Sequence, residues 1–280
     1  MKVVVTISGS DSGGGSGIQA DLRSISANGG FGASIVTAVT TQNTVEVTMS
    51  QEIAPAMIDA QLDAVFSDIR VAAVKTGTLA SEQVIETVAS ALQRHRPAYY
   101  VLDPVIFSRS GHRLLDESAM AALRRELFPV ATVITSGVRE AEALAGSEVR
   151  SLRDAESVGR RLLDFGAAAV LIEGGGLLGD RATDVLVTED GCETVQGEWI
   201  ETRHTHGTGC TYSAAIATHL ARGRSLSDAV RLSKDYVTEA IRSAISIGQG
   251  TGPIDHLFYL RRDDAADWTG RLRLDRSGDE

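Results

Sequence analysis

The pentapeptide His206-Gly207-Thr208-Gly209-Cys210 precedes an apolar run that begins at Ala214. Two closely spaced glycines let successive N–H groups turn outward at a helix N-terminus, where these donors and the helix dipole attract an anion. Cys210 would lie in the first turn, where the dipole favours a thiolate and lowers the pKa. Phosphoryl transfer to an alcohol needs such an anion site beside a base that takes the hydroxyl proton. A glycine turn followed by a structural cysteine would give the same pentapeptide.

The segment 8–17, rich in glycine and serine, is a second candidate for ligand contact. It is not a Walker A loop, because the chain contains no Gly-Lys pair, and its glycine spacing does not fit a dinucleotide-binding loop. Residues 174–179 match the dinucleotide pattern literally, but a turn and hairpin follow instead of a helix, so we interpret that match as chance. We expect the segment 8–17 to form a loop over a ligand.

Two carboxylates, Asp103 and Glu140, could hold Mg²⁺ through water, since Mg²⁺ binds few carboxylates and retains several waters. Taken singly, such residues are more often helix caps or surface charges. His204 and His206 flank one residue, but without a third ligand a solvated loop is the better interpretation. Cys192 follows a turn and is interpreted as structural.

The elements that must position these residues alternate along the chain. Short apolar runs predict strands, and apolar residues at helical spacing lie between them. This alternation predicts one α/β domain over residues 1–260, with a mainly parallel central sheet and helices on both faces. The strands are expected at 3–7, 33–39, 71–74, 99–102, 131–134 and 168–172, a hairpin at 183–202 with its turn at Asp190-Gly191, and helices around 18–25, 58–66, 84–92, 120–127, 158–165, 214–220 and after Ser225.

Polar residues and glycines gather where the predicted strands end, at 8–11, 40–43, 75–78, 103 and 173–176. Ligands of open α/β sheets bind beyond the carboxyl ends of the strands, so these segments are the expected site. The charge-dense segment 261–280 is predicted to be a polar tail.

The composition narrows the function classes. The 280 residues carry a formal charge of −10 and no basic stripe, which disfavours nucleic acid as a partner. Two cysteines cannot form a disulfide framework, so a cytoplasmic location is expected. The N-terminus is too short for a signal sequence, and no apolar run approaches 18 residues, so no membrane association is expected.

Together these residues resemble the hydroxymethylpyrimidine/phosphomethylpyrimidine kinases of thiamine biosynthesis, in the ribokinase-like superfamily. The resemblance extends in order from residue 1 to about residue 256. The matching segments are 7–14, 17–22, 41–44, 65–68, 103–105, 110–111, 205–211 and 252–256. It implies a ribokinase-like domain, ATP and Mg²⁺ as cofactors, a small-molecule pyrimidine substrate, and a homodimer.

The resemblance also implies roles for individual residues. Gln42 and Asp21 would contact the aminopyrimidine ring, and Cys210 would be the base within an anion hole. The anion hole would comprise Gly207, Thr208, Gly209 and Cys210; Asp103 and Glu140 would lie near Mg²⁺, and Arg109 and Asp184 near the nucleotide phosphates. The family phosphorylates a hydroxymethyl group and then the resulting phosphate. Only the hydroxyl must lose a proton, so Cys210 should matter mainly for the first step.

Four positions depart from the family pattern. Arg109 replaces a lysine, Gly137 replaces an asparagine, Glu173 replaces a lysine, and Thr78 stands where methionine is frequent. The changes at 137 and 173 bear on nucleotide binding, and Thr78 bears on substrate choice. Arg109 keeps the charge but not the geometry of lysine.

Two other functions fit the same residues. One is a kinase of the same fold that acts on pyridoxal or pyridoxine, which also carry a hydroxymethyl group on a ring. The other is a non-catalytic module that binds the pyrimidine without ATP turnover. Glu173 and Gly137 favour the module, whereas Cys210 and its anion hole oppose it.

Overall fold

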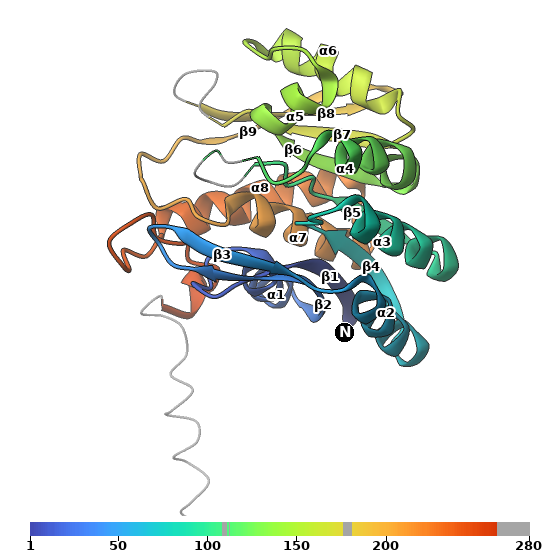
Figure 1. Ribbon diagram of the computed structural model, residues 1–280. Helices are drawn as coiled ribbons and strands as arrows, with labels where there is room; N and C mark the ends of the chain where they lie inside the picture. The colour runs from blue at the N-terminus through green and yellow to red at the C-terminus, as the bar shows by residue number, and fades with distance from the viewer. Residues whose placement is uncertain (108–110, 112, 176–180, 262–280) are drawn as a thin grey trace, which may run out of the picture.

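The computed structural model describes residues 1–107, 111, 113–175 and 181–261, and nine strands from these residues form one sheet (Figure 1). Six neighbouring strands are parallel, whereas the edge strand β3 and the pair β8–β9 run antiparallel to their neighbours. The order across the sheet is β3 (Val47–Glu52), β2 (Gly30–Gln42), β1 (Lys2–Asp11), β4 (Val71–Thr76), β5 (Tyr99–Leu102), β6 (Val133–Gly137), β7 (Ala169–Glu173), β8 (Arg181–Thr188) and β9 (Gly191–Glu198).

Helices cover both faces of the sheet, as expected for parallel strands joined by crossovers. One face packs against α1 (Gly17–Ala27), α7 (Thr208–Ala221) and α8 (Leu226–Arg242). The opposite face packs against α2 (Pro55–Asp68), α3 (Glu82–His95), α4 (Glu117–Ala122), α5 (Val138–Ala145) and α6 (Leu152–Leu163). The α/β architecture predicted from the sequence is confirmed.

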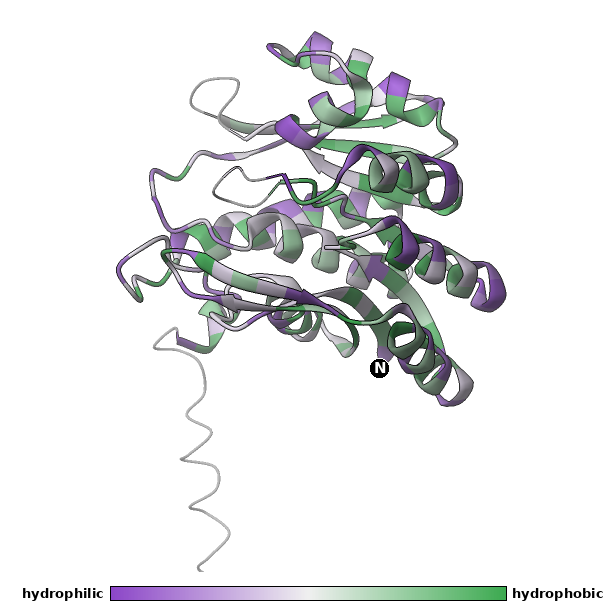
Figure 2. Cartoon of the chain, viewed as in Figure 1, coloured by the Kyte–Doolittle hydropathy of each residue, from purple (hydrophilic) through white to green (hydrophobic). Residues whose placement is uncertain are grey.

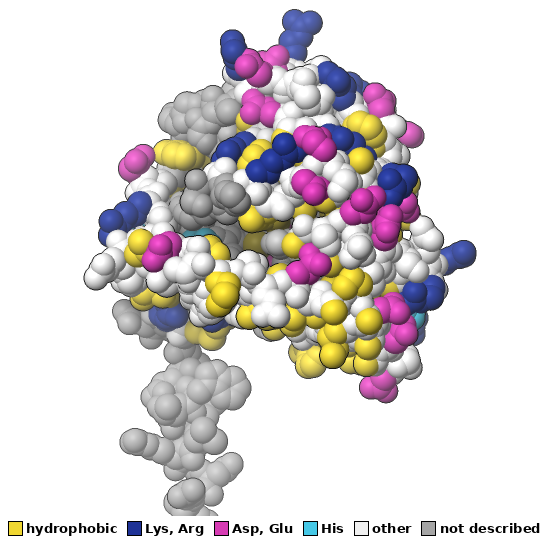
Figure 3. Space-filling view, in the orientation of Figure 1, with side chains coloured by type: hydrophobic (Ala, Val, Ile, Leu, Met, Phe, Trp, Pro, Cys, Tyr) yellow, Lys and Arg dark blue, Asp and Glu magenta, His cyan; other side chains and the backbone are white. Residues whose placement is uncertain are grey.

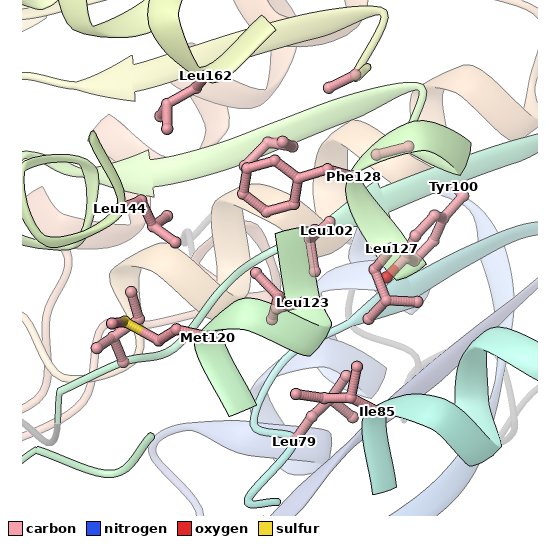
Figure 4. Packing of buried hydrophobic residues seen from close by; sticks show 14 of the residues in the cluster. Leu79, Ile85, Tyr100, Leu102, Met120, Leu123, Leu127, Phe128, Leu144 and Leu162 are labelled. Atoms are coloured by element: carbon pink, nitrogen blue, oxygen red, sulfur yellow. The ribbon is translucent and has the colours of Figure 1, made fainter. Parts of the chain in front are cut away.

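Two apolar clusters, one on each side of the sheet, hold these layers together. On the α2–α6 side, Leu102 from β5 lies among Leu123, Leu127 and Phe128, which follow α4 (Figure 4). Leu144 and Leu162 extend the same cluster toward α5 and α6. Hydrophilic residues occupy the outer surfaces of the helices, so the apolar sides are directed inward (Figure 2).

The structure agrees with most elements predicted from periodicity, and the differences have local causes. The helix expected at 120–127 begins at Glu117 and is α-helical only to Ala122, followed by a π-turn (Leu123–Leu127) and a 3₁₀ turn (Phe128–Val130) that holds Pro129. Proline cannot donate a helical hydrogen bond, which accounts for an end there. The hairpin β8–β9 is confirmed, with Thr188 opposite Gly191.

Two elements were not predicted. Strand β3 is exposed along its whole length, and the short alternation of Val47 and Met49 with polar residues was the signal that could have identified it. Helix α5 has only eight residues, too few for a clear helical period. The predicted tail begins at Arg261, but this residue ends a 3₁₀ turn (Phe258–Arg261) and pairs with Asp255; positions 262–280 lie outside the described residues. In the described part of the chain, no helix is long and apolar enough to cross a membrane.

Candidate active site

The first turn of α7 lies at the carboxyl edge of the parallel strands, as the pentapeptide predicted. Gly207 is the N-cap residue with a φ of 85°, which favours glycine. A Cβ atom at this position would lie 1.9 Å from the carbonyl oxygen of Gly15, so only glycine permits this approach of the two loops. The N–H groups of Gly209 and Cys210 belong to the first turn, where a helix offers no partner. The turn is therefore equipped to bind an anion.

The segment 8–17 is the end of β1 and a tight glycine loop, and Asp11 organises it. Asp11 Oδ2 accepts from the N–H groups of Gly15 and Ser16 at 3.1 and 2.9 Å, and from Ser16 Oγ at 2.9 Å. Asp11 Oδ1 accepts from the Gly13 N–H at 2.8 Å. A carboxylate with so many donors is fixed in place, and so is the loop that supplies them.

His206 joins this loop to the first turn of α7. Its Nε2 lies 3.0 Å from Asp11 Oδ2 and 3.2 Å from Gln42 Nε2 at the end of β2. The interpretation of 204–206 as a solvated loop was wrong for His206, whose side chain is only 13% exposed. His204 is held differently, because its Nδ1 accepts from the Gly252 N–H at 2.9 Å. Gln42, predicted to contact the ring, thus lies beside the predicted anion site.

Lys75 at the end of β4 is a buried cation that the sequence analysis did not assign. Its Nζ donates to both oxygens of Asp21 at 2.9 and 3.0 Å and lies 3.6 Å from Asp103 Oδ2. Burial lowers the pKa of Lys75, but the charges of Asp21, Cys210 and Asp103 outweigh it and raise the pKa. A lone lysine in an otherwise apolar strand was the signal that could have identified it.

Asp21 lies deeper than the predicted contact with a ring requires. It is fully buried on α1, and Thr6 Oγ1 donates to its Oδ2 at 2.5 Å in addition to the Lys75 bonds. Burial raises the pKa of Asp21, and Lys75 opposes this. Asp21 therefore pairs with Lys75, which also lies near Asp103, and the contact of Asp21 with the pyrimidine ring stays a prediction.

The expected pKa of Cys210 was wrong in direction. Burial is the largest influence and raises the pKa of the thiol to about 12; the charge of Lys75 and the Gly17 N–H, which donates to the sulfur, lower it only in part. Cys210 is a free thiol of intermediate exposure. Desolvation and the nearby carboxylates of Asp21 and Asp103 raise this pKa, so a place in the first turn of a helix did not by itself predict its direction.

Three further carboxylates surround the predicted nucleotide side. Asp103 Oδ2 accepts from Ser213 Oγ of α7 at 3.1 Å, and Glu140 lies in the first turn of α5. Burial raises the pKa of Asp103, Glu140 and Glu173, and nearby acids add to this at the two glutamates. Glu173 Oε2 lies 3.9 Å from the position that a Cβ on Gly209 would take, so it is directed at the first turn of α7. Within the described residues, this side of the site therefore gathers carboxyl groups whose charged forms are disfavoured by burial.

The two residues predicted near the nucleotide phosphates have different outcomes. Asp184 is buried, and its Oδ2 accepts from Lys234 Nζ at 2.7 Å while its Oδ1 accepts from the Gly174 N–H at 3.2 Å. These contacts join Asp184 to α8 and to Gly174, directly after β7, and its place near the nucleotide phosphates stays a prediction. Arg109 lies outside the described residues.

Comparison with known proteins decides the family. The family described as phosphomethylpyrimidine kinase matches residues 11–255, most of the chain. The chain belongs to the phosphomethylpyrimidine kinase family. A hydroxymethylpyrimidine/phosphomethylpyrimidine kinase of Rhizobium meliloti is 46% identical over 268 residues, which cover 93% of this chain and 99% of the relative. The resemblance inferred from the motifs is confirmed.

Two other similarities define the limits of this relationship. A thiamine biosynthesis bifunctional protein of Geobacter sulfurreducens is 42% identical over 254 residues, 91% of this chain but only 52% of that protein, so this chain spans about half of it. A Bacillus subtilis pyridoxal kinase, solved as an ADP complex, superimposes with a TM-score of 0.85 at 34% identity, covering 91% of this chain and 97% of that one. Members of the phosphomethylpyrimidine kinase family and a pyridoxal kinase thus share this fold.

Within this family member, the departures at 78 and 137 have definite places. Thr78 follows β4; its N–H donates to Ser8 Oγ at 3.1 Å, and its carbonyl accepts from Thr37 Oγ1 at 2.7 Å. Gly137 is the N-cap of α5, so Glu140 lies in the turn that an asparagine at 137 would cap. A Cβ at 137 would lie 2.8 Å from Glu140 Oε2, so an asparagine would require this carboxylate to move.

Proposed function

We propose that the protein transfers a phosphoryl group from ATP to the hydroxymethyl oxygen of 4-amino-5-hydroxymethyl-2-methylpyrimidine, and then from a second ATP to the monophosphate. The observation that carries this proposal is the position of Gln42 beside His206, the residue before the turn 207–210. A polar side chain that can bind a ring nitrogen or an amine thus adjoins donors that can bind a phosphate. The membership of the phosphomethylpyrimidine kinase family supports the same substrate.

In the first transfer, the N–H groups of the 207–210 turn stabilise charge that develops on the transferred phosphoryl group. Cys210 accepts the hydroxyl proton as the phosphorus–oxygen bond forms. Its high pKa makes the thiol a strong base once ionised, but the ionised form is scarce at neutral pH. Lys75 lowers the pKa of Cys210 and so increases that fraction. The second transfer starts from a phosphate oxygen that is already anionic and needs no base.

Asp103 and Glu140 fit a site for Mg²⁺ that is completed by water and phosphate oxygens. Burial and, at Glu140, the charge of Asp103 raise the pKa of these carboxyls, so a divalent cation would stabilise their charged forms. Among the described residues, no group of three or more His, Cys, Asp or Glu could hold a metal by itself. When bound, Mg²⁺ supplies charge neutralisation at the nucleotide phosphates.

We further propose that the protein acts as a cytoplasmic homodimer. Both cysteines are free thiols, which suits a reducing compartment. Edge strand β3 is fully exposed and carries Val47 and Met49 at 48% and 63% exposure, beside Met57 of α2 at 58%. Yellow side chains gather over the region of α2 in Figure 3. An uncovered apolar edge strand is a template for pairing with another chain, and a second copy would cover it.

The net charge of −10 supports neither nucleic acid nor an anionic membrane as a partner.

A coupled ADP-release assay tests the activity with Mg²⁺, ATP and one acceptor at a time. We expect turnover with the hydroxymethylpyrimidine and with its monophosphate. The second candidate is pyridoxal, favoured by the similarity to the B. subtilis pyridoxal kinase; strong turnover of pyridoxal alone would replace our proposal. Binding of the pyrimidine in calorimetry without ADP release would instead identify a non-catalytic binding module.

The Gln42→Ala variant tests the ring contact in the same protein. The loss of a buried hydrogen-bond partner costs about 1–3 kcal/mol, so pyrimidine affinity should fall by roughly one to two orders of magnitude. Affinity for ATP should be nearly unchanged. Equal losses for both ligands in calorimetry would remove Gln42 from the ring site.

A further inference from the structure

Three segments that lie far apart in the sequence meet at one imidazole. His206 belongs to the loop before α7, Asp11 ends β1, and Gln42 ends β2. Nε2 of His206 lies 3.0 Å from Asp11 Oδ2 and 3.2 Å from Gln42 Nε2. With its proton on Nε2, the ring donates to the carboxylate, so this nitrogen accepts nothing from the Gln42 amide that lies beside it. Gln42 is joined to the glycine loop through its backbone, because its N–H donates to Ser12 Oγ at 2.8 Å and its carbonyl oxygen lies 2.8 Å from the same hydroxyl. The contact therefore connects the strand edge that would bind a ring to the turn that would bind a phosphate.

The glycine loop packs closely against this contact. A Cβ on Gly15 would lie 2.3 Å from His206 Cδ2, so the glycine loop packs directly on the imidazole. The N–H groups that Asp11 accepts come from Gly13, Gly15 and Ser16, so the carboxylate that receives His206 also holds this loop. A displacement of His206 would change the surroundings of Asp11, and with them the loop.

His206 is also fixed from its other side. Its N–H donates to the Gly252 carbonyl at 3.2 Å, and its carbonyl accepts from the Ile254 N–H at 3.4 Å. The backbone is thus anchored to the segment 252–254 while the side chain reaches to Asp11. The next residue is Gly207, the N-cap of α7, so the position of this imidazole and the start of the anion-binding turn are set together.

We propose that Asp11 and His206 are a positioning pair that fixes Gln42, the glycine loop 12–16 and the 207–210 turn in one arrangement. In its kinetic consequences the inference rests on the proposed function. A substrate oxygen displaced by about 1 Å from the phosphoryl group can cost roughly 10²-fold in rate. Because both transfers use the same turn, the pair serves both steps, whereas Cys210 serves mainly the first.

The kinetic test uses the full-length protein with Asp11→Asn, His206→Ala and the double variant. We expect each single variant to lower kcat by about 10²-fold for both acceptors and to raise KM for the pyrimidine. The kcat of the double variant should not fall below the lower kcat of the two single variants, because the two residues act through each other. His206→Gln should recover most of the activity, since its amide N–H can donate to Asp11.

A structural readout that needs no substrate is hydrogen exchange of the peptides covering 11–17 and 206–212. We expect both single variants to speed exchange in both peptides by about tenfold. Asp11→Asn weakens the charge-assisted hydrogen bonds of the loop, and His206→Ala removes the imidazole that donates to Asp11 and packs on Gly15. Exchange in α3 should be unchanged. The matched control is His204→Ala, which removes a neighbouring imidazole that accepts from Gly252 but does not contact Asp11; it should leave exchange in 11–17 as in the unmodified protein.

The two readouts separate failure of this inference from failure of the proposed function. If the unmodified protein turns over neither acceptor, the exchange data alone still decide whether the pair joins the two segments. Unchanged exchange in 11–17 in His206→Ala would overturn the inference. Faster exchange with unchanged kcat and KM would also overturn it, since the contact would then stabilise the loop without positioning anything for catalysis. Additive losses in the double variant would show that Asp11 and His206 act separately.

Discussion

Lys75 and Asp21 form an ion pair that no solvent reaches: both side chains are 0% exposed, and Lys75 Nζ lies 2.9 Å from Asp21 Oδ1. The same Nζ also lies 3.6 Å from Asp103 Oδ2. A buried charge without its partner is costly, whereas a buried pair is close to neutral relative to apolar residues.

We therefore expect Asp21→Asn to lower the free energy of unfolding by about 3–5 kcal/mol. The double variant Asp21→Asn/Lys75→Met should recover much of this loss, because it removes both charges. Arg94→Met is the control, since the Arg94–Asp59 pair is about 40% exposed on both sides and should cost under about 1 kcal/mol. Urea unfolding measures all three. A loss below that of the control would show that Asp21 does not compensate Lys75.

Asp11 predicts a pH dependence of stability. Burial raises the pKa of this carboxyl, but hydrogen bonds from His206, Ser16 and the Gly13 N–H outweigh it and lower the pKa from 3.8 to about 2. A lowered pKa stabilises the fold above pH 3.8, and the contribution is lost as the pH falls from about 4 to about 2. The difference in free energy of unfolding between the unmodified protein and Asp11→Asn should be about 2 kcal/mol at pH 6 and should shrink toward pH 3. A constant difference across this range would contradict the assignment.

Glu173 predicts a dependence of the opposite sign. Burial, Asp184 and Asp103 raise its pKa well above 4.5, so the folded protein retains a proton that the unfolded chain releases. Its contribution to stability is fully present below pH 4.5 and decreases as the pH rises. Glu173→Gln should therefore be more stable than the unmodified protein at pH 8 and similar to it at pH 4.5.

Glu173→Lys should keep activity and lower the KM for ATP, because a cation then faces the first turn of α7. Loss of turnover in Glu173→Lys would mean that the carboxylate itself is required.

Cys210 predicts an asymmetry between the two transfers. Cys210→Ala should slow the first transfer by about 10²–10⁴-fold and the second much less, because only the hydroxyl has a proton to remove. The first transfer should accelerate as the pH rises toward 9, since the pKa of the thiol is raised to about 12. Cys210→Asp should recover part of the first step. Single-turnover kinetics on each acceptor measure these effects. Equal losses in both steps would make Cys210 part of the anion site and not the base.

The sequence by itself determined the local elements and the chemistry of the motifs. Glycines at 207 and 209 before an apolar helix predicted the turn of α7, because a positive φ and free N–H groups are properties of a short segment. Alternating apolar runs predicted the parallel sheet, because burial on both faces requires them. Even the family could be inferred, since the motifs occur in order along most of the chain.

Only the tertiary structure decided which residues meet and how they titrate. The Asp11–His206 contact joins residues 195 positions apart, and no local pattern pairs one acid with one histidine. In the sequence, Lys75 is one polar residue in a predicted strand; only the fold brings Asp21 and Asp103 next to it. Cys210 illustrates the reason most directly: its neighbours in sequence predicted a lowered pKa, but its neighbours in space raise it, because desolvation and nearby charges depend on distance and not on sequence.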